Sequence, residues 1–137
     1  MDAIEREITI AASPQRVYEI VTRPEHMGVW FGDAGAEREG DTITMRWTSG
    51  DSGELRVVQE DPPHAFAYRW NAFDPAAGET LVEFTFTAEG EGTRLKVRES
   101  GWDQLRGEPE HLRELREGNV RGWKSELGDL ERYAQTV

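Results

Sequence analysis

Apolar residues near the end of the chain recur with the spacing of an amphipathic helix. Between residues 108 and 134 they lie three or four positions apart, with one gap. Pro109 and Glu110 suit the first turn of such a helix, because proline needs no amide partner there and a carboxylate complements the helix dipole. The stripe that we expect to pack on the rest of the protein is Leu112, Leu115, Trp123, Leu127, Leu130 and Ala134.

Three glycines interrupt this helix, at Gly118, Gly122 and Gly128. Each interior glycine costs about 1 kcal/mol relative to alanine. We therefore expect either that the helix backbone approaches another element closely or that space is left beside the helix for something else.

The first thirty residues predict one strand and two short helices. Apolar and polar residues alternate over residues 4–11, as in a strand with one buried face. Ser13 can cap a helix that begins at Pro14, and Pro24 ends this helix and begins a second one that extends to Trp30.

From Asp33 to Ser100 the apolar residues recur with a period of two, which predicts short strands separated by turns. A loop over residues 73–78 separates two of them. The alternation in the last strand points Glu99 toward the apolar face. The economical arrangement is a curved antiparallel sheet around the long helix, with strands at residues 42–47, 54–57, 65–70, 82–87 and 94–98.

Composition narrows the classes of partner. The 137 residues fit one domain spanning the whole chain, and the net charge of −11 opposes nucleic acid and anionic membranes. The chain has no cysteine, no apolar run of membrane-spanning length and no signal-peptide pattern. We expect a cytoplasmic protein that does not insert into membranes.

Short motifs follow one another along nearly the whole chain: Ile8-Thr9-Ile10-Ala11-Ala12-Ser13-Pro14; Pro24-Glu25-His26 with Trp30-Phe31; Gly53-Glu54; Asp61-Pro62-Pro63-His64; Tyr68-Arg69-Trp70; Gly92-Thr93-Arg94-Leu95; Glu99-Ser100-Gly101-Trp102; and Gly122-Trp123 with Leu127, Leu130 and Tyr133. In this order they resemble the START-like (SRPBCC) superfamily, and within it the family named after the C-terminal domain of the activator of the heat-shock protein 90 ATPase. The resemblance implies an α+β helix-grip fold, in which a curved antiparallel sheet with two short helices wraps around a long C-terminal helix. It also implies a pocket between sheet and helix, which in the superfamily holds lipids, sterols, polyketides or other hydrophobic molecules.

Aromatic residues dominate the faces that we expect to point inward. All five tryptophans fall there or at the mouth of the expected pocket. The alternative interpretation is that these side chains simply fill a curved sheet too wide for aliphatic packing. The predicted lining of the cavity is Trp30, Phe31, Met45, Trp47, Tyr68, Trp70, Phe84, Phe86, Glu99, Trp102, Trp123 and Leu127.

Glu99 is the candidate catalytic residue. Inside the pocket, desolvation would favour its neutral form and make it an acid or base near neutral pH. It would otherwise be paired with an arginine such as Arg46 or Arg69, or lie in water at a strand end. The three histidines are isolated in sequence, so we predict no metal site and no cofactor.

Three functions remain open at this stage. The first is binding of a small hydrophobic or lipid-like molecule without catalysis, by a monomer or homodimer. The second is a polyketide-cyclase-like enzyme that uses Glu99, with Tyr68 as a further polar group, as acid or base. The third is a co-chaperone-like module that binds another protein. We favour the first, because it requires only an apolar cavity, whereas acid–base catalysis usually requires two suitably placed ionisable groups.

Overall fold

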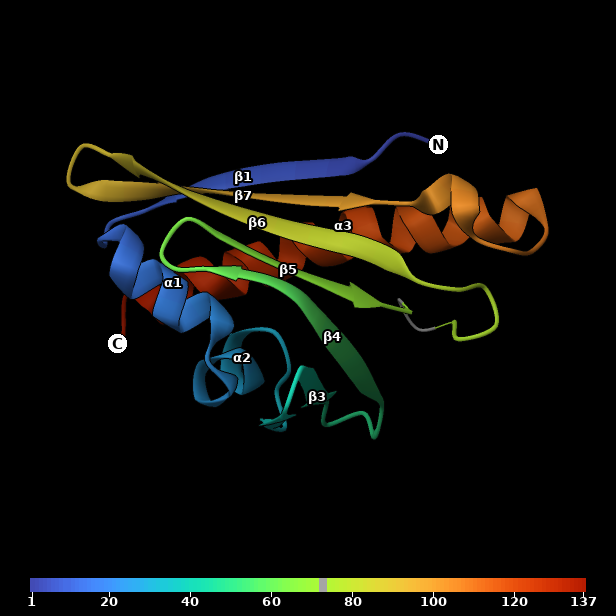
Figure 1. Ribbon diagram of the computed structural model, residues 1–137, viewed down its shortest axis with the longest axis horizontal. Coiled ribbons are helices and arrows are strands. Elements are labelled where there is room, and N and C mark those ends of the chain that lie inside the picture. Colours follow the sequence, from blue (N-terminus) through green and yellow to red (C-terminus); the bar gives the residue numbers. More distant parts are fainter. Residues whose placement is uncertain (72–73) are drawn as a thin grey trace.

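One antiparallel sheet of seven strands forms the body of the protein in a computed structural model, which describes residues 1–71 and 74–137 (Figure 1). The predicted loop over residues 73–78 begins at Phe73, which lies outside the described residues. The strands follow the order β1-β7-β6-β5-β4-β3-β2. Their bounds are β1 Ile4–Ile10, β2 Ala36–Glu39, β3 Thr42–Arg46, β4 Ser52–Asp61, β5 Ala65–Trp70, β6 Thr80–Glu89 and β7 Gly92–Ser100.

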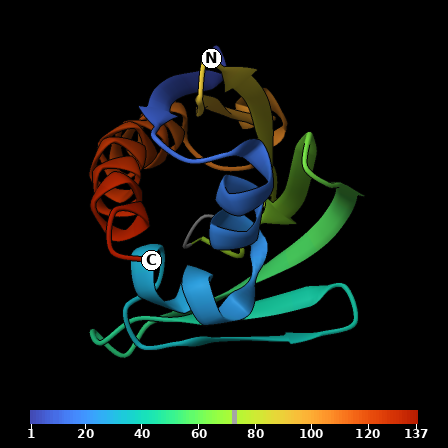
Figure 2. The ribbon, with the colours of Figure 1, turned by 90° about the vertical axis from the view of Figure 1, so that its left-hand side faces the viewer.

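Three α-helices accompany the sheet: α1 (Pro14–Thr22), α2 (Pro24–Trp30) and α3 (Pro109–Ala134), with a 3-10 turn, η1, at Trp102–Gln104. Ser13 caps α1 as predicted, because its Oγ accepts from the Arg16 amide at 3.2 Å. Figure 2 shows the sheet curving from β1 around to β2, with α3 on the open side of the curve. The predicted α+β helix-grip fold is therefore confirmed.

The strand periodicity sets which side chains point toward α3. On β6 and β7 the buried residues alternate with more exposed ones, as expected for a sheet with one face in the core. On β5 the small Ala67 is buried as well as its neighbours Phe66 and Tyr68. The register places Glu99 of β7 opposite Val82 of β6 and Ile4 of β1, one strand in from the β1 edge of the sheet. Glu99 therefore points into the core, as its parity predicts.

Two strands differ from the sequence expectation. The pattern does not locate β2, because its four residues, Ala-Glu-Arg-Glu, have no buried position at this sheet edge. β4 runs to Asp61, well past the predicted end at Val57. A register shift between Val57 and Gln59 breaks the alternation and leaves Val58 exposed.

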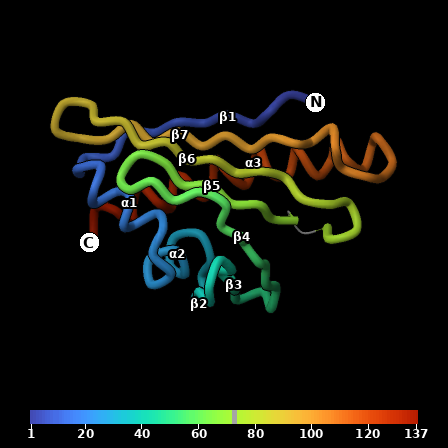
Figure 3. The backbone as a smooth tube through the Cα atoms, viewed as in Figure 1, coloured from blue at the N-terminus to red at the C-terminus, as the bar shows by residue number. Residues whose placement is uncertain are grey.

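Contacts between distant parts of the chain hold α3 in place. Figure 3 shows β1 running beside β7 at one edge of the sheet. Just before β1, the carbonyls of Asp2 and Ala3 accept from the Arg116 guanidinium of α3 at 2.8 and 3.4 Å. Near the C-terminus, His26 Nδ1 of α2 lies 2.7 Å from the Tyr133 hydroxyl of α3. None of the helices within the described residues is long and apolar enough to cross a membrane.

Candidate functional site

A cavity of about 120 Å³ lies between α3 and one end of the sheet. Phe31 follows α2, Trp47 follows β3 and Trp70 is the last residue of β5; the other lining residues belong to α3. Larger hollows of about 520 and 580 Å³ are lined by polar groups on the surface around β4. The cavity beneath α3 is lined by Phe31, Trp47, Trp70, Gly118, Asn119, Gly122, Trp123 and Glu126.

The α3 glycines leave the space for this cavity. Gly118 and Gly122 are one helical turn apart and both line it. A Cβ atom at Gly122 would meet nothing within 4 Å, and one at Gly118 would meet only the Arg121 guanidinium at 4.0 Å. Of the two explanations for these glycines, the structure therefore supports space beside the helix over close backbone approach.

Four aromatic rings meet at the cavity, with Phe31 at their centre. Its ring is stacked on Trp123, with centroids 5.7 Å apart and an interplanar angle of 8°. Trp70 and Trp47 contact the same ring, at centroid distances of 5.6 and 6.0 Å. The packing of these rings on one another fixes an aromatic wall without filling the space beside α3.

Glu99 lies fully buried behind this wall and is not among the residues lining the cavity. Its Oε2 accepts from Trp70 Nε1 at 2.9 Å and from the Thr80 hydroxyl at 2.6 Å. Its Oε1 accepts from Trp123 Nε1 at 2.9 Å, and Asn119 Nδ2 donates to both oxygens, at 3.0 and 3.2 Å. Four side-chain donors therefore surround the carboxyl group, which is the environment that an ionised carboxylate requires.

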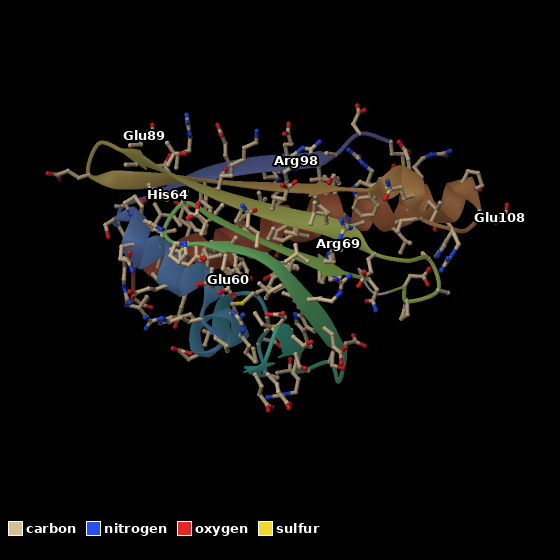
Figure 4. The ribbon with its side chains drawn as sticks, in the orientation of Figure 1. Glu60, His64, Arg69, Glu89, Arg98 and Glu108 are labelled. Carbon is tan, nitrogen blue, oxygen red and sulfur yellow. The ribbon has the colours of Figure 1, made fainter. Side chains whose placement is uncertain are left out.

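The arginine pairing considered for Glu99 does not occur. Arg46 instead pairs with Glu37 at 2.5 Å. Arg69, labelled in Figure 4, lies between the inward-pointing Tyr68 and Trp70 on β5 and so belongs to the outer face of the sheet. Hydrogen bonds stabilise the buried carboxylate, and the bonds in turn fix the orientation of two indoles and one amide at the cavity.

The tryptophans present ring carbon, not N–H groups, to the cavity. Trp70 and Trp123 donate their indole N–H groups to Glu99, and Trp47 donates its own to the Phe31 carbonyl at 3.0 Å. The lining made by these three rings is therefore apolar and rich in π-electrons.

Asn119 and Glu126 are polar lining residues that were not predicted from the sequence, and Glu126 is the ionisable one. Burial, and secondarily the negative charges of Asp129 and Asp33, raise its pKa from 4.5 to about 8. Its Oε2 is buried and has no hydrogen-bond partner among the described residues. At neutral pH this side chain is mainly a neutral acid at an otherwise aromatic cavity.

One signal in the sequence points to Glu126. It lies three residues after Trp123 and four after Gly122, so it shares a helix face with both. A charged residue at the edge of an apolar stripe normally points to solvent, so the spacing alone does not place Glu126 at the cavity.

The other predicted lining residues form the packed core around the cavity. Tyr68 is fully buried, and its burial, with the nearby Glu99 and Glu126, raises the pKa of its hydroxyl well above the usual value. Trp102 donates its indole N–H to the Glu99 main-chain carbonyl at 3.1 Å. These side chains fill most of the space between sheet and helix, and they are Trp30, Met45, Tyr68, Phe84, Phe86, Trp102 and Leu127.

The histidines serve other contacts. His111 Nε2 lies 2.7 Å from an Asp74 carboxylate oxygen, a bond that lowers the pKa of Asp74, and His26 pairs with Tyr133. Within residues 1–71 and 74–137, no three His, Cys, Asp or Glu side chains are grouped so that they could hold a metal ion.

The family can be assigned from the sequence as a whole. The model of the family described as activator of Hsp90 ATPase homolog 1-like protein matches residues 11–135. The chain belongs to this family. No curated protein matches the sequence significantly.

Solved structures with the same fold include three that cover nearly the whole chain. Protein MLL2253 from Mesorhizobium loti has a TM-score of 0.79 at 22% identity, with 98% of each chain covered. The Aha1 dimer from Colwellia psychrerythraea has a TM-score of 0.76 at 18% identity, covering 96% of this chain and 94% of that one. DynU16, from the dynemicin biosynthetic locus, has a TM-score of 0.75 at 26% identity; 99% of this chain corresponds to 48% of DynU16.

Proposed function

We propose that this member of the family binds a small, largely apolar molecule in the cavity between α3 and the sheet. The observation that carries the proposal is the combination of an aromatic wall with two helix glycines that leave the adjacent space empty. Such glycines weaken α3 by about 1 kcal/mol each, a cost that packing against the sheet alone does not explain. Family membership and the occurrence of the fold in a biosynthetic locus are compatible with ligand binding.

The size of the cavity limits the ligand. A cavity of about 150 Å³ is sufficient for benzene, whereas drug-sized ligands occupy roughly 300 to 1,000 Å³. The volume of about 120 Å³ lies slightly below the first of these figures and therefore limits the bound part of a ligand to a single ring or a compact head group. A lipid or polyketide would need α3 to move away from the sheet or would leave most of its length outside.

The enzymatic alternative gains little from the geometry. Glu99 would have to exchange a proton with a substrate, but it lies behind Trp70 and Trp123 and its oxygens are already used by protein donors. The hydrogen bonds of Glu99 instead suit a residue that fixes the orientation of Trp70, Trp123 and Asn119. The co-chaperone alternative depends on fold likeness to Aha1, which does not carry a function by itself.

The test is a thermal-shift titration with toluene on matched glycine variants. Toluene should raise the melting temperature of the wild-type protein, because a ligand that binds only the folded state stabilises it. Gly122→Leu should abolish the shift, since the new side chain occupies the cavity. Gly128→Leu is the control: it changes the same helix outside the cavity lining, where Cβ would meet only the Arg132 side chain at 3.6 Å.

Two outcomes would overturn the proposal. One is the absence of any toluene-dependent shift in the wild-type protein at concentrations near the solubility of toluene. The other is a shift that persists unchanged in Gly122→Leu.

A further inference from the structure

The polar groups at the cavity are strongly biased toward hydrogen-bond acceptors. The N–H donors of Trp47, Trp70 and Trp123 are all directed to protein oxygens. Asn119 Nδ2 is bound to Glu99, and the carboxylate fixes this orientation because it can only accept from the amide nitrogen. The Asn119 amide therefore keeps Oδ1 as an acceptor for a ligand, while an N–H of Nδ2 is committed to Glu99.

The second acceptor, once it is ionised, is Glu126, whose Oε2 is buried and unpaired among the described residues. Around it the charges are negative: Asp129 on α3 and Asp33 after α2 both act on its ionisation. Tyr68 of β5, whose raised pKa keeps its hydroxyl neutral also in mildly alkaline solution, and Glu99 of β7, held by four donors, lie behind the cavity wall. A positive group near this cavity is the Arg121 guanidinium, which lies 4.0 Å from the position that a Cβ atom at Gly118 would take. The ring faces add a negative quadrupole potential.

This inference rests on the proposed function and specifies the ligand. We propose that the cavity binds the cationic ammonium group of an organic molecule, held against the faces of the tryptophan rings with Glu126 as its counter-ion. Cation–π attraction is strongest for tryptophan and increases when the cation is desolvated. A compact alkylammonium group also fits the volume of about 120 Å³.

Ionisation of Glu126 supplies a signature of such binding. With a pKa of about 8, the empty protein holds a proton on Glu126 at neutral pH. A bound cation takes the place of that proton as the neutralising charge, so binding at pH 7 should release close to one proton. As the pH is raised toward 8, the affinity for a cation should increase nearly tenfold per pH unit. Above pH 8, where Glu126 is already ionised, the affinity should level off.

The experiment compares choline with 3,3-dimethylbutan-1-ol, in which carbon replaces the charged nitrogen and the shape is kept. Calorimetric titrations of the whole protein at pH 6, 7, 8 and 9 should show choline binding at least about tenfold more tightly than the alcohol at pH 8. The affinity of the alcohol should not increase with pH. In Glu126→Gln, choline affinity at pH 9 should fall about tenfold or more and lose its pH dependence.

The outcomes separate this inference from the proposed function. Equal or tighter binding of the neutral alcohol would overturn the cation assignment and leave ligand binding in place. Binding of toluene without choline would have the same meaning. Choline affinity that does not change with pH, or that is unchanged in Glu126→Gln, would overturn the role of Glu126.

Discussion

Glu99→Gln should destabilise the fold strongly although it changes a single atom. The carboxylate accepts from Trp70, Thr80, Trp123 and Asn119, so the new amide nitrogen must face at least one N–H donor in either orientation. In the less disruptive orientation it replaces Oε1 and loses the Trp123 bond and a share of the Asn119 bond. Hydrogen bonds to charged groups contribute roughly 1.5 to 3 kcal/mol each. We therefore expect a loss of about 3 kcal/mol.

Chemical denaturation at pH 7, read by tryptophan fluorescence, measures this loss, and the melting temperature should fall by roughly 10 °C. Glu126→Gln is the matched control, because that carboxyl group is mainly protonated at pH 7 and has an unpaired oxygen. At pH 7 this variant should be no less stable than the wild type, because the wild-type carboxyl group must take up a proton on folding and the amide need not. A Glu99→Gln protein as stable as the wild type would refute the claim that Glu99 is held as an ionised acceptor of the four donors.

Two further predictions concern folding. The pKa of Glu126 is raised in the folded protein, so ionisation of this group favours the unfolded chain. The free energy of unfolding of the wild type, compared with that of Glu126→Gln, should therefore be highest below pH 4.5 and should decrease as the pH rises to about 8. The loss should be about 2 kcal/mol after allowance for partial solvent exposure, measured by urea denaturation from pH 4 to 9; a constant difference would contradict the burial of this group. Among glycines, Gly122→Ala should stabilise the protein by about 1 kcal/mol. Gly28→Ala should destabilise it by several kcal/mol, because its Cβ would lie 2.6 Å from the Ala36 backbone nitrogen. If the melting temperatures of the two variants moved in the same direction, the claim that Gly122 borders free space and Gly28 does not would be wrong.

The sequence predicts much of this fold because local rules and tertiary packing agree in most elements. Alternation locates the strands that have one face in the core, and its parity correctly points Glu99 inward. Ser13, Pro14 and Pro24 mark helix boundaries that the structure reproduces. The edge strand β2 is the exception, since a strand with no buried face carries no hydrophobic period.

The candidate site was harder to predict because its properties come from contacts between distant segments. Parity aims Glu99 at the core but cannot show that Thr80 and Asn119, 19 and 20 residues away, provide its donors. Helical spacing places Glu126 beside Trp123, but its burial depends on how the sheet end closes on α3. The spare volume at Gly122 likewise results from the whole packing.

The most direct test of a ligand site beneath α3 is the indole region of a ¹H–¹⁵N correlation spectrum, recorded while choline or toluene is added. The five indole N–H groups are all hydrogen-bonded in distinct places, so each should give a separate signal. We predict saturable shifts for Trp47, Trp70 and Trp123. The signals of Trp30 and Trp102, whose N–H groups bind the Ile20 and Glu99 carbonyls, should stay in place. No shift with either probe, or equal shifts in all the indoles, would contradict binding in this cavity.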